Sequence, residues 1–185
     1  MPQDGSRLVI NNMFREFEEN YQYLMDNQQV SFATDYKAQF SKVLLLSVAS
    51  YFESRVTEQL KSILLADQCS MVKSFLENKA LSRQYHTLFN WKQGAGGANQ
   101  FFGFLGKGFG QFMDRKKDEQ PELKQSIANF MDLGYARNLM VHENYATFKL
   151  EMTSDDIKSK FESAILFADN LEKFAKEFRE LQAVP

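Results

Sequence analysis

An arginine and a histidine with four residues between them, Arg137 and His142, stand near the end of a long helical pattern. The chain has only two histidines, and this one follows a permanent cation and the side-chain amide of Asn138. An imidazole can accept or donate a proton near neutral pH, and a guanidinium can bind a phosphate group. These residue types therefore suit proton transfer at a phosphodiester.

Helical geometry decides which of these side chains can meet. At about 100° per residue, Asn138, His142 and Tyr145 share one stripe of a helix. Arg137 lies roughly 140° from His142 around that helix, so the long reach of Arg137, a local unwinding or a second subunit must complete the site. Gly134 exposes backbone on the same face and indicates a close neighbour, because a helical glycine costs about 1 kcal/mol relative to alanine. We therefore predict a homodimer with its two-fold axis near this face.

The same residues also fit a purely structural role. On that interpretation His142 favours the C-terminal end of its helix through the helix dipole, and Arg137 pairs with a nearby acid such as Glu143 or Asp132. The chain would then be a structural bundle without a site. Spacing alone does not separate these interpretations, so the elements that carry the residues must be considered.

Helical spacing of apolar residues dominates the remainder of the chain. Helices are predicted over residues 6–26, 35–64, 70–79 and 83–91, from Pro121 through the Arg137 segment, and from Thr153 or Ser154 to about 181. Strand alternation is nowhere convincing. We predict an all-α antiparallel helical bundle that forms a single domain over residues 1–185.

A segment rich in glycine and phenylalanine in the middle of the chain is the one irregular region. Gly94, Ala95, Gly96 and Gly97 come first, and five phenylalanines, Phe101, Phe102, Phe104, Phe109 and Phe112, follow with further glycines between them. Glycine at this density predicts a loop or a poor helix whose backbone can approach another group closely. The rings either stack on bases, insert at a membrane surface, or pack a glycine-thinned helix against the core; we favour packing.

Positive charge is concentrated just before the Arg137 helix. Residues 79–117 contain seven basic residues and one acid, a balance of +6, in a chain whose overall charge is −2. This clustering suits the approach of a polyanion, although a solvated surface would look the same. We assign substrate binding to the basic residues nearest the proposed site, which are Lys107, Arg115, Lys116 and Lys117.

Other site classes have little support in the residues. Cys69 is the only cysteine, and the histidines are far apart without paired ligands, so we predict no metal and no cofactor. His86 is interpreted as a packing histidine. The start at Met1 lacks the features of a signal peptide, and no apolar run approaches the roughly 20 residues of a bilayer span. We expect a cytoplasmic protein with no membrane association.

The spacing of Arg137 and His142, with Asn138 directly after the arginine, resembles the Arg-x(4–6)-His motif of HEPN domains. This all-α family includes many metal-independent endoribonucleases. Residues 44–53 look like the family's long second helix, and residues 99–103 look like the middle segment of the RiboL-PSP-HEPN group. The resemblance implies that RNA is the partner and that Arg137, Asn138 and His142 are catalytic. An acid that interrupts an apolar helix face, as Glu53 does, usually marks a surface position, yet the resemblance allows Glu53 to orient Arg137 or His142. Tyr145 is a further candidate for an orienting role, because it shares the helical stripe of Asn138 and His142.

The function that follows is RNA cleavage by attack of the 2′-hydroxyl, leaving a 2′,3′-cyclic phosphate and a 5′-hydroxyl. The resemblance further implies a toxin or antiviral defence effector with an antitoxin or nucleotidyltransferase partner. Some HEPN toxins are silenced on a tyrosine in a His-x-Tyr pattern, whereas Tyr145 is one residue too far from His142. The alternative is a non-catalytic module that binds RNA, a nucleotide or a partner protein.

Overall fold

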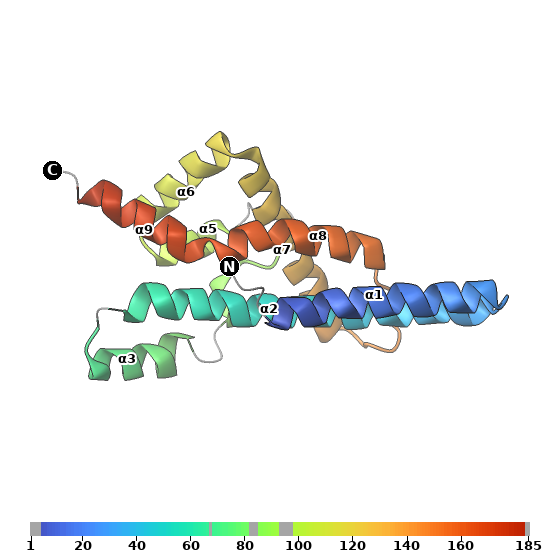
Figure 1. Ribbon diagram of the computed structural model, residues 1–185. Helices are drawn as coiled ribbons and strands as arrows, with labels where there is room; N and C mark the ends of the chain where they lie inside the picture. Colours follow the sequence, from blue (N-terminus) through green and yellow to red (C-terminus); the bar gives the residue numbers. More distant parts are fainter. Residues whose placement is uncertain (1–4, 67, 82–84, 93–97, 184–185) are drawn as a thin grey trace.

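The computed structural model describes residues 5–66, 68–81, 85–92 and 98–183, and within these ranges every regular element is a helix. The elements are α1 (Gly5–Asp26), α2 (Val30–Leu65), α3 (Ser70–Leu76), the π-helical turn η1 (Glu77–Leu81), α4 (Tyr85–Leu88), α5 (Asn99–Phe104), α6 (Lys107–Glu119), α7 (Pro121–His142), α8 (Ser154–Asp169) and α9 (Leu171–Gln182). The all-α fold is therefore confirmed. Figure 1 shows α1 and α2 running across the molecule, with α8, α9 and α6 above them and α3 below α2.

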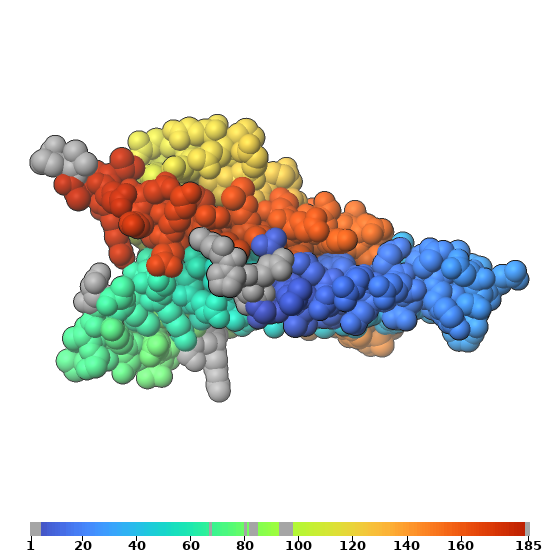
Figure 2. Space-filling model, in the orientation of Figure 1, coloured from blue at the N-terminus to red at the C-terminus, as the bar shows by residue number. Residues whose placement is uncertain are grey.

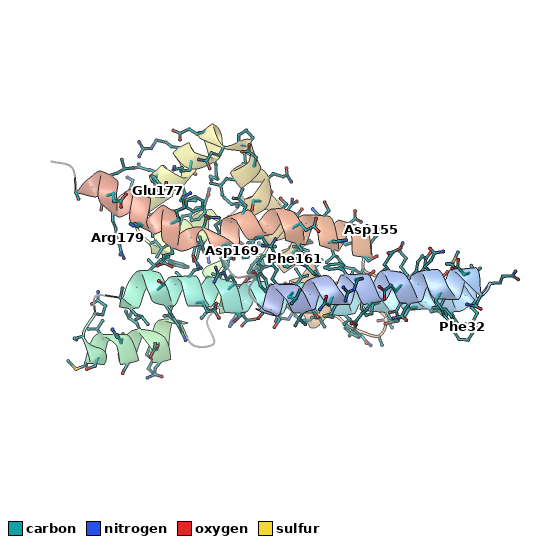
Figure 3. All side chains as sticks on the ribbon, viewed as in Figure 1. Phe32, Asp155, Phe161, Asp169, Glu177 and Arg179 are labelled. Atoms are coloured by element: carbon teal, nitrogen blue, oxygen red, sulfur yellow. The ribbon has the colours of Figure 1, made fainter. Side chains whose placement is uncertain are left out.

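Two long neighbouring helices in Figure 1, α1 and α2, form an antiparallel pair that runs across the molecule. The chain reverses between them at Gln28, which has a positive φ of 59°. The ring of Phe17 on α1 stacks on Tyr36 and Phe40 of α2, with centroids 5.4 and 4.9 Å apart. These contacts hold α1 and α2 together where their connected ends project past α8. Figure 3 shows the exposed Phe32 at this projecting end.

An aromatic cluster joins α2 to α7 and α8. The buried ring of Phe52 lies 5.3 Å from Phe130 and 5.6 Å from Phe161, measured between centroids. Phe130 also meets Phe167 at 5.1 Å, edge to face. Burying each such side chain stabilises the fold by about 1.5–3 kcal/mol. The cluster therefore fixes α7 across α2, and in Figure 1 α7 runs from α6 behind α8 to the lower edge of α2.

The C-terminal helix is interrupted, whereas the sequence predicts one continuous helix to residue 181. It begins as predicted at Ser154, but α8 ends at Asp169 and Asn170 has the non-helical angles φ −110° and ψ 9°. Asp169 pairs with Arg55 of α2 at 2.6 Å, and Arg179 of α9 donates to the carbonyl of Ile63 at 2.6 Å. Figure 3 shows Asp169 and Arg179 on the side of the chain that faces α2. The axis of α9 therefore differs from that of α8. The contact of Asp169 fixes the end of α8 on α2, and the contact of Arg179 fixes α9 on α2.

The described part of the glycine and phenylalanine segment is helical and forms α5 and α6. Gly106, with φ 109°, separates the two helices. Four of the rings, Phe101, Phe102, Phe109 and Phe112, are buried in the core, so the packing interpretation is correct for them. It is wrong for Phe104, the last residue of α5, which is 65% exposed. Gly94, Ala95, Gly96 and Gly97 lie outside the described residues.

The two short helices expected between α2 and α5 differ from the prediction in length. The first ends as an α-helix at Leu76 and continues as η1 to Leu81, and α4 covers only Tyr85–Leu88. Figure 2 shows α3 at one corner of the molecule, beside the C-terminal half of α2. Among the described helices, none is both long and apolar enough to cross a bilayer.

Candidate active site

A pocket between α2, α4 and α7 contains both members of the arginine–histidine pair. It has a volume of about 230 Å³, and its apolar wall comes from α2, α7 and the Trp91 ring. Its polar lining residues are Glu53 from α2, Tyr85 and His86 from α4, and Arg137, Asn138 and His142 from α7. The sequence predicted four of these six residues for the site.

The polar α7 residues of the pocket all lie in the last two turns of that helix. Arg137 and Asn138 are half-buried, whereas His142, the last residue of α7, is exposed. Nη1 of Arg137 donates a hydrogen bond to Oδ1 of Asn138 at 3.4 Å. Asn138 thus contacts the guanidinium that it follows in sequence. The angular separation of Arg137 and His142 does not keep them apart, since both line the same pocket of one chain.

Trp91 is the close neighbour that Gly134 indicated. Its six-membered ring lies against the backbone of Gly134, where the Cβ of any larger residue would overlap it. The indole Nε1 donates to the main-chain carbonyl of His86 at 3.0 Å. Trp91 therefore fastens α4 to α7. The neighbour belongs to the same chain, so the glycine no longer argues for a second subunit at this position, and the homodimer stays a prediction.

The pKa of Tyr85 is affected by a charged group of α2 and by one of α7, so both groups lie near its phenol. Burial raises the pKa of Tyr85, and the negative charge of Glu53 raises it further. The positive charge of Arg137 acts in the opposite direction. Both charges are therefore near the phenol. Glu53 itself is exposed and lines the pocket from α2, and no ion pair joins it to Arg137 among the described residues, so its orienting role stays a prediction.

Tyr145 does not line this pocket, and its predicted place on the stripe of Asn138 and His142 is wrong. The reason is that α7 ends at His142 and the backbone turns extended at Glu143, with ψ 172°. The main-chain carbonyl of Tyr145 accepts a hydrogen bond from Nζ of Lys42 at 3.0 Å. The same ammonium lies 5.0 Å from the centre of the Tyr145 ring.

The predicted substrate-binding residues lie on α6, away from the pocket. None of Lys107, Arg115, Lys116 and Lys117 is among the residues that line it. The four predicted substrate-binding residues therefore lie outside the lining of the pocket that holds the arginine–histidine pair.

Two of these cations already have partners. Lys116 pairs with Glu177 of α9 at 2.8 Å, and Glu177 is labelled in Figure 3. Lys117 pairs with Asp114 at 2.7 Å and also donates to the amide oxygen of Asn99 at 3.0 Å. By contrast, Lys107 and Arg115 are exposed, and no ion pair joins either to another described residue. A polyanion on α6 would meet those two first.

Sequence reasoning missed His86, the second histidine of the chain. It was interpreted as a packing residue, but it is exposed and lines the pocket with His142. Its neighbours Tyr85, Phe89 and Trp91 explain the difference: they supply the packing of this segment, with ring centroids 4.9–5.8 Å apart. The sequence offered one signal for a functional role of His86: the chain has only two histidines, and one of them lies in the aromatic segment from Tyr85 to Trp91.

The size of the pocket limits what it can hold. At about 230 Å³ it is smaller than the 300–1,000 Å³ or so of typical cofactor and drug sites. Within the described ranges, no three histidine, cysteine, aspartate or glutamate residues are grouped so as to share a metal ion.

Comparison with known proteins gives a match at the level of a family. The family model described as RiboL-PSP-HEPN matches residues 10–177. These residues run from α1 into α9 and include every residue that lines the pocket. Neither the curated proteins nor the solved structures gave a match.

Proposed function

The chain belongs to the RiboL-PSP-HEPN family, and we propose that it is a metal-independent endoribonuclease. One observation carries the proposal: Arg137, Asn138 and His142 line the same pocket, opposite the carboxylate of Glu53. A purely structural role for the pair would place Arg137 in an ion pair with Glu143 or Asp132. Instead, Asp132 pairs with Lys160 at 2.5 Å, and the only hydrogen bond of the Arg137 guanidinium within the described chain is to Asn138.

RNA brings its own nucleophile, so the enzyme must move protons and neutralise charge. The 2′-oxygen forms a bond to phosphorus as its proton leaves, and the bond from phosphorus to the 5′-oxygen breaks as that oxygen gains a proton. His142 is placed to take part in this proton transfer. Arg137 stabilises the additional negative charge that develops on the phosphate. The products are a 2′,3′-cyclic phosphate and a 5′-hydroxyl.

The surroundings of Arg137 favour a fixed guanidinium. Asn138 accepts a hydrogen bond from it, and Glu53 places a negative charge on the opposite wall of the pocket. A preorganised donor stabilises a transition state better than a mobile one, because it needs no reorganisation during the reaction. Glu53 and Asn138 therefore act as positioning residues for Arg137 in this proposal.

A non-catalytic RNA-binding module is the second candidate, and the position of α6 favours it. The exposed cations Lys107 and Arg115 lie on α6, outside the lining of the pocket, where they bind a backbone without contributing to chemistry. Binding through such residues depends strongly on salt but not on the pocket. Pocket variants should therefore reduce turnover if the chain is a ribonuclease, and they should leave RNA binding unchanged if the chain binds RNA through α6.

Cleavage of single-stranded RNA by the purified chain tests the proposal. We expect products that end in a 2′,3′-cyclic phosphate, identified by mass spectrometry. A matched strand with a single 2′-deoxy sugar at the cut position should bind and resist cleavage, because it lacks the nucleophile. Cleavage of the deoxy strand would refute the mechanism. Binding of both strands without cleavage of either would favour the binding module.

The family resemblance also suggests a cellular role, which we propose as that of a toxin or defence effector. Controlled expression should then arrest growth, and substitution of His142 should relieve the arrest. A partner encoded beside the gene, such as an antitoxin or a nucleotidyltransferase, should restore growth when it is co-expressed. Growth arrest that persists in His142→Ala would separate the toxicity from the pocket.

A further inference from the structure

The second histidine of the pocket, His86, has no task in the chemistry of Arg137 and His142. It is exposed, it is placed on α4, and its side chain lines the same cavity of about 230 Å³ as His142. Its imidazole makes no hydrogen bond or ion pair to another described residue. The chain has only two histidines, and the fold brings them from positions 86 and 142 to one small pocket.

The position of His86 is fixed by its main chain. Trp91 donates from Nε1 to the carbonyl of His86, and its ring rests against Gly134. The next carbonyl, that of Thr87, accepts a hydrogen bond from the side-chain amide of Gln100 at 2.9 Å. Two consecutive carbonyls of α4 are thus held by other segments. The backbone is anchored while the imidazole is left free to meet a ligand.

We propose that His86 and His142 form an acid–base pair for RNA cleavage within one chain. This inference rests on the proposed endoribonuclease function and adds a catalytic residue to it. One imidazole, in its neutral form, removes the proton of the 2′-hydroxyl. The other, in its protonated form, gives a proton to the departing 5′-oxygen. The proton gained by the first equals the proton given up by the second, and exchange with water restores both.

RNA cleavage requires two proton transfers, and a single imidazole cannot serve both positions at once. During a single attack, the proton leaves the 2′-oxygen and another is gained at the 5′-oxygen, on opposite sides of the phosphorus. A single ring at the end of α7 can serve one of these positions at a time. With His142 on α7 and His86 on α4, the two rings approach a bound phosphate from different walls, and Arg137 lies on the lining between α7 and α2. A pair of this kind adds about 10²–10⁴-fold for each proton transfer.

The charged and titratable groups around His86 are those of the pocket itself. Glu53 faces it from α2, Tyr85 precedes it on α4, and Arg137 and His142 face it from α7. Only one of these four is a histidine. An acid–base mechanism needs one group that takes up a proton and one that gives a proton up, and His86 is the second imidazole that lines this pocket.

The experiment uses an RNA substrate whose leaving 5′-oxygen is replaced by sulfur, since a thiolate departs without a proton. On ordinary RNA, His86→Ala and His142→Ala should each lower kcat at least 100-fold. On the sulfur substrate, the variant that lacks the acid should recover to within about tenfold of the wild-type chain, and the variant that lacks the base should stay slow. Recovery of one variant supports the pair and assigns its roles.

His86→Gln and Asn20→Ala are the controls. Glutamine keeps a polar side chain of similar length but does not titrate, so His86→Gln should be as slow as His86→Ala and should lose one limb of the pH profile. Asn20, an exposed residue of α1 outside the pocket, should give wild-type rates. If His86→Ala does not fold, as judged by circular dichroism, His86→Gln replaces it in the sulfur experiment.

Several results would overturn the pair. Cleavage of ordinary RNA by the folded His86 variants within threefold of wild type would show that His86 has no catalytic role. Recovery of both variants or of neither on the sulfur substrate would mean that the rings do not divide the two transfers. An inactive wild-type chain would overturn the endoribonuclease function itself, and the acid–base pair with it.

Discussion

The indole ring of Trp91 occupies the space that a side chain at Gly134 would need. The contact joins a short connecting segment to the helix that carries the arginine–histidine pair. The Trp91 ring forms part of the pocket wall. Its packing on Gly134 and its hydrogen bond to His86 also fix the position of α4 relative to α7. A change at Gly134 should therefore disturb the site without touching any polar residue in it.

Gly134→Ala tests this contact directly. Forcing a methyl group against the ring should displace Trp91, at a cost of about 1–3 kcal/mol, while the helix gains about 1 kcal/mol in propensity. We expect a modest net loss of stability, a large loss of RNA cleavage and a red shift of tryptophan emission. The emission reports this site alone, because Trp91 is the only tryptophan.

Gly103→Ala is the matched control, because a Cβ at that helical position meets nothing within 4 Å. It should keep the emission and the cleavage rate of the wild-type chain, with unchanged or slightly higher stability. Unchanged emission and activity in Gly134→Ala would show that the packing of Trp91 on Gly134 has no influence on the pocket.

Arg137→Ala and His142→Ala should each reduce cleavage at least 100-fold. His142 is exposed and Arg137 is half-buried at the pocket wall, so the thermal midpoints should change by no more than a few degrees. Chelating agents should leave the wild-type rate unchanged. Loss of activity in parallel with loss of the folded state, followed by circular dichroism, would favour the structural interpretation of the pair.

The basic helix α6 should contribute to RNA affinity through its two unpaired cations. The double variant Lys107→Ala and Arg115→Ala should weaken binding and reduce the slope of log affinity against log salt by about 0.7 for each phosphate that the variant no longer neutralises. Fluorescence anisotropy at several salt concentrations measures both. Lys116→Ala is the comparison and should have less effect, because Lys116 already pairs with Glu177. Equal effects of both changes would mean that the ion pair opens to bind RNA.

Tyr85 should make stability fall at alkaline pH. Burial, with Glu53, raises its pKa, so the folded chain keeps the phenolic proton at pH values where the unfolded chain releases it. The contribution of Tyr85 to the free energy of unfolding is therefore constant below the ordinary tyrosine pKa of about 10. It is lost as the pH rises beyond that value. Urea unfolding between pH 8 and 11 should show a shallower decline in Tyr85→Phe. The exposed Tyr23→Phe should decline like the wild type.

A homodimer remains a prediction, and light scattering on the purified chain tests it. We expect twice the monomer mass at tens of micromolar, with or without RNA. Because the pocket already holds Arg137 and His142 from one chain, mixed dimers with one His142→Ala subunit should keep about half of the activity. A strict monomer that cleaves RNA would show that the pocket needs no second copy.

Local signals in the sequence were sufficient for most helices. Pro121 marks the first turn of α7 as predicted, because proline is favoured where the amide has no helical partner. The first helix was expected over 6–26 and extends over Gly5–Asp26. These features depend on neighbouring residues, which a sequence displays directly. The start of α2 at Val30 rather than 35 is a boundary error of the same local kind.

The features that were missed depend on residues far apart in the chain. The break at Asn170 is held by contacts of Asp169 and Arg179 with α2, more than 100 positions earlier. The position of His86 depends on Trp91 meeting Gly134. The place of Glu53 in the pocket, by contrast, was anticipated through the family resemblance rather than from its own neighbours. Periodicity identifies faces of helices but not their partners.

The pocket is assembled from three distant parts of the chain, around Glu53, His86 and Arg137. A ribosome adds roughly 5–20 residues per second, and the last of these parts follows the first by more than 80 residues. The nascent chain can thus form the α1–α2 hairpin long before a complete pocket exists. Under the proposed function, the nascent polypeptide cannot cut the messenger that encodes it before His142 has been added and the pocket has formed.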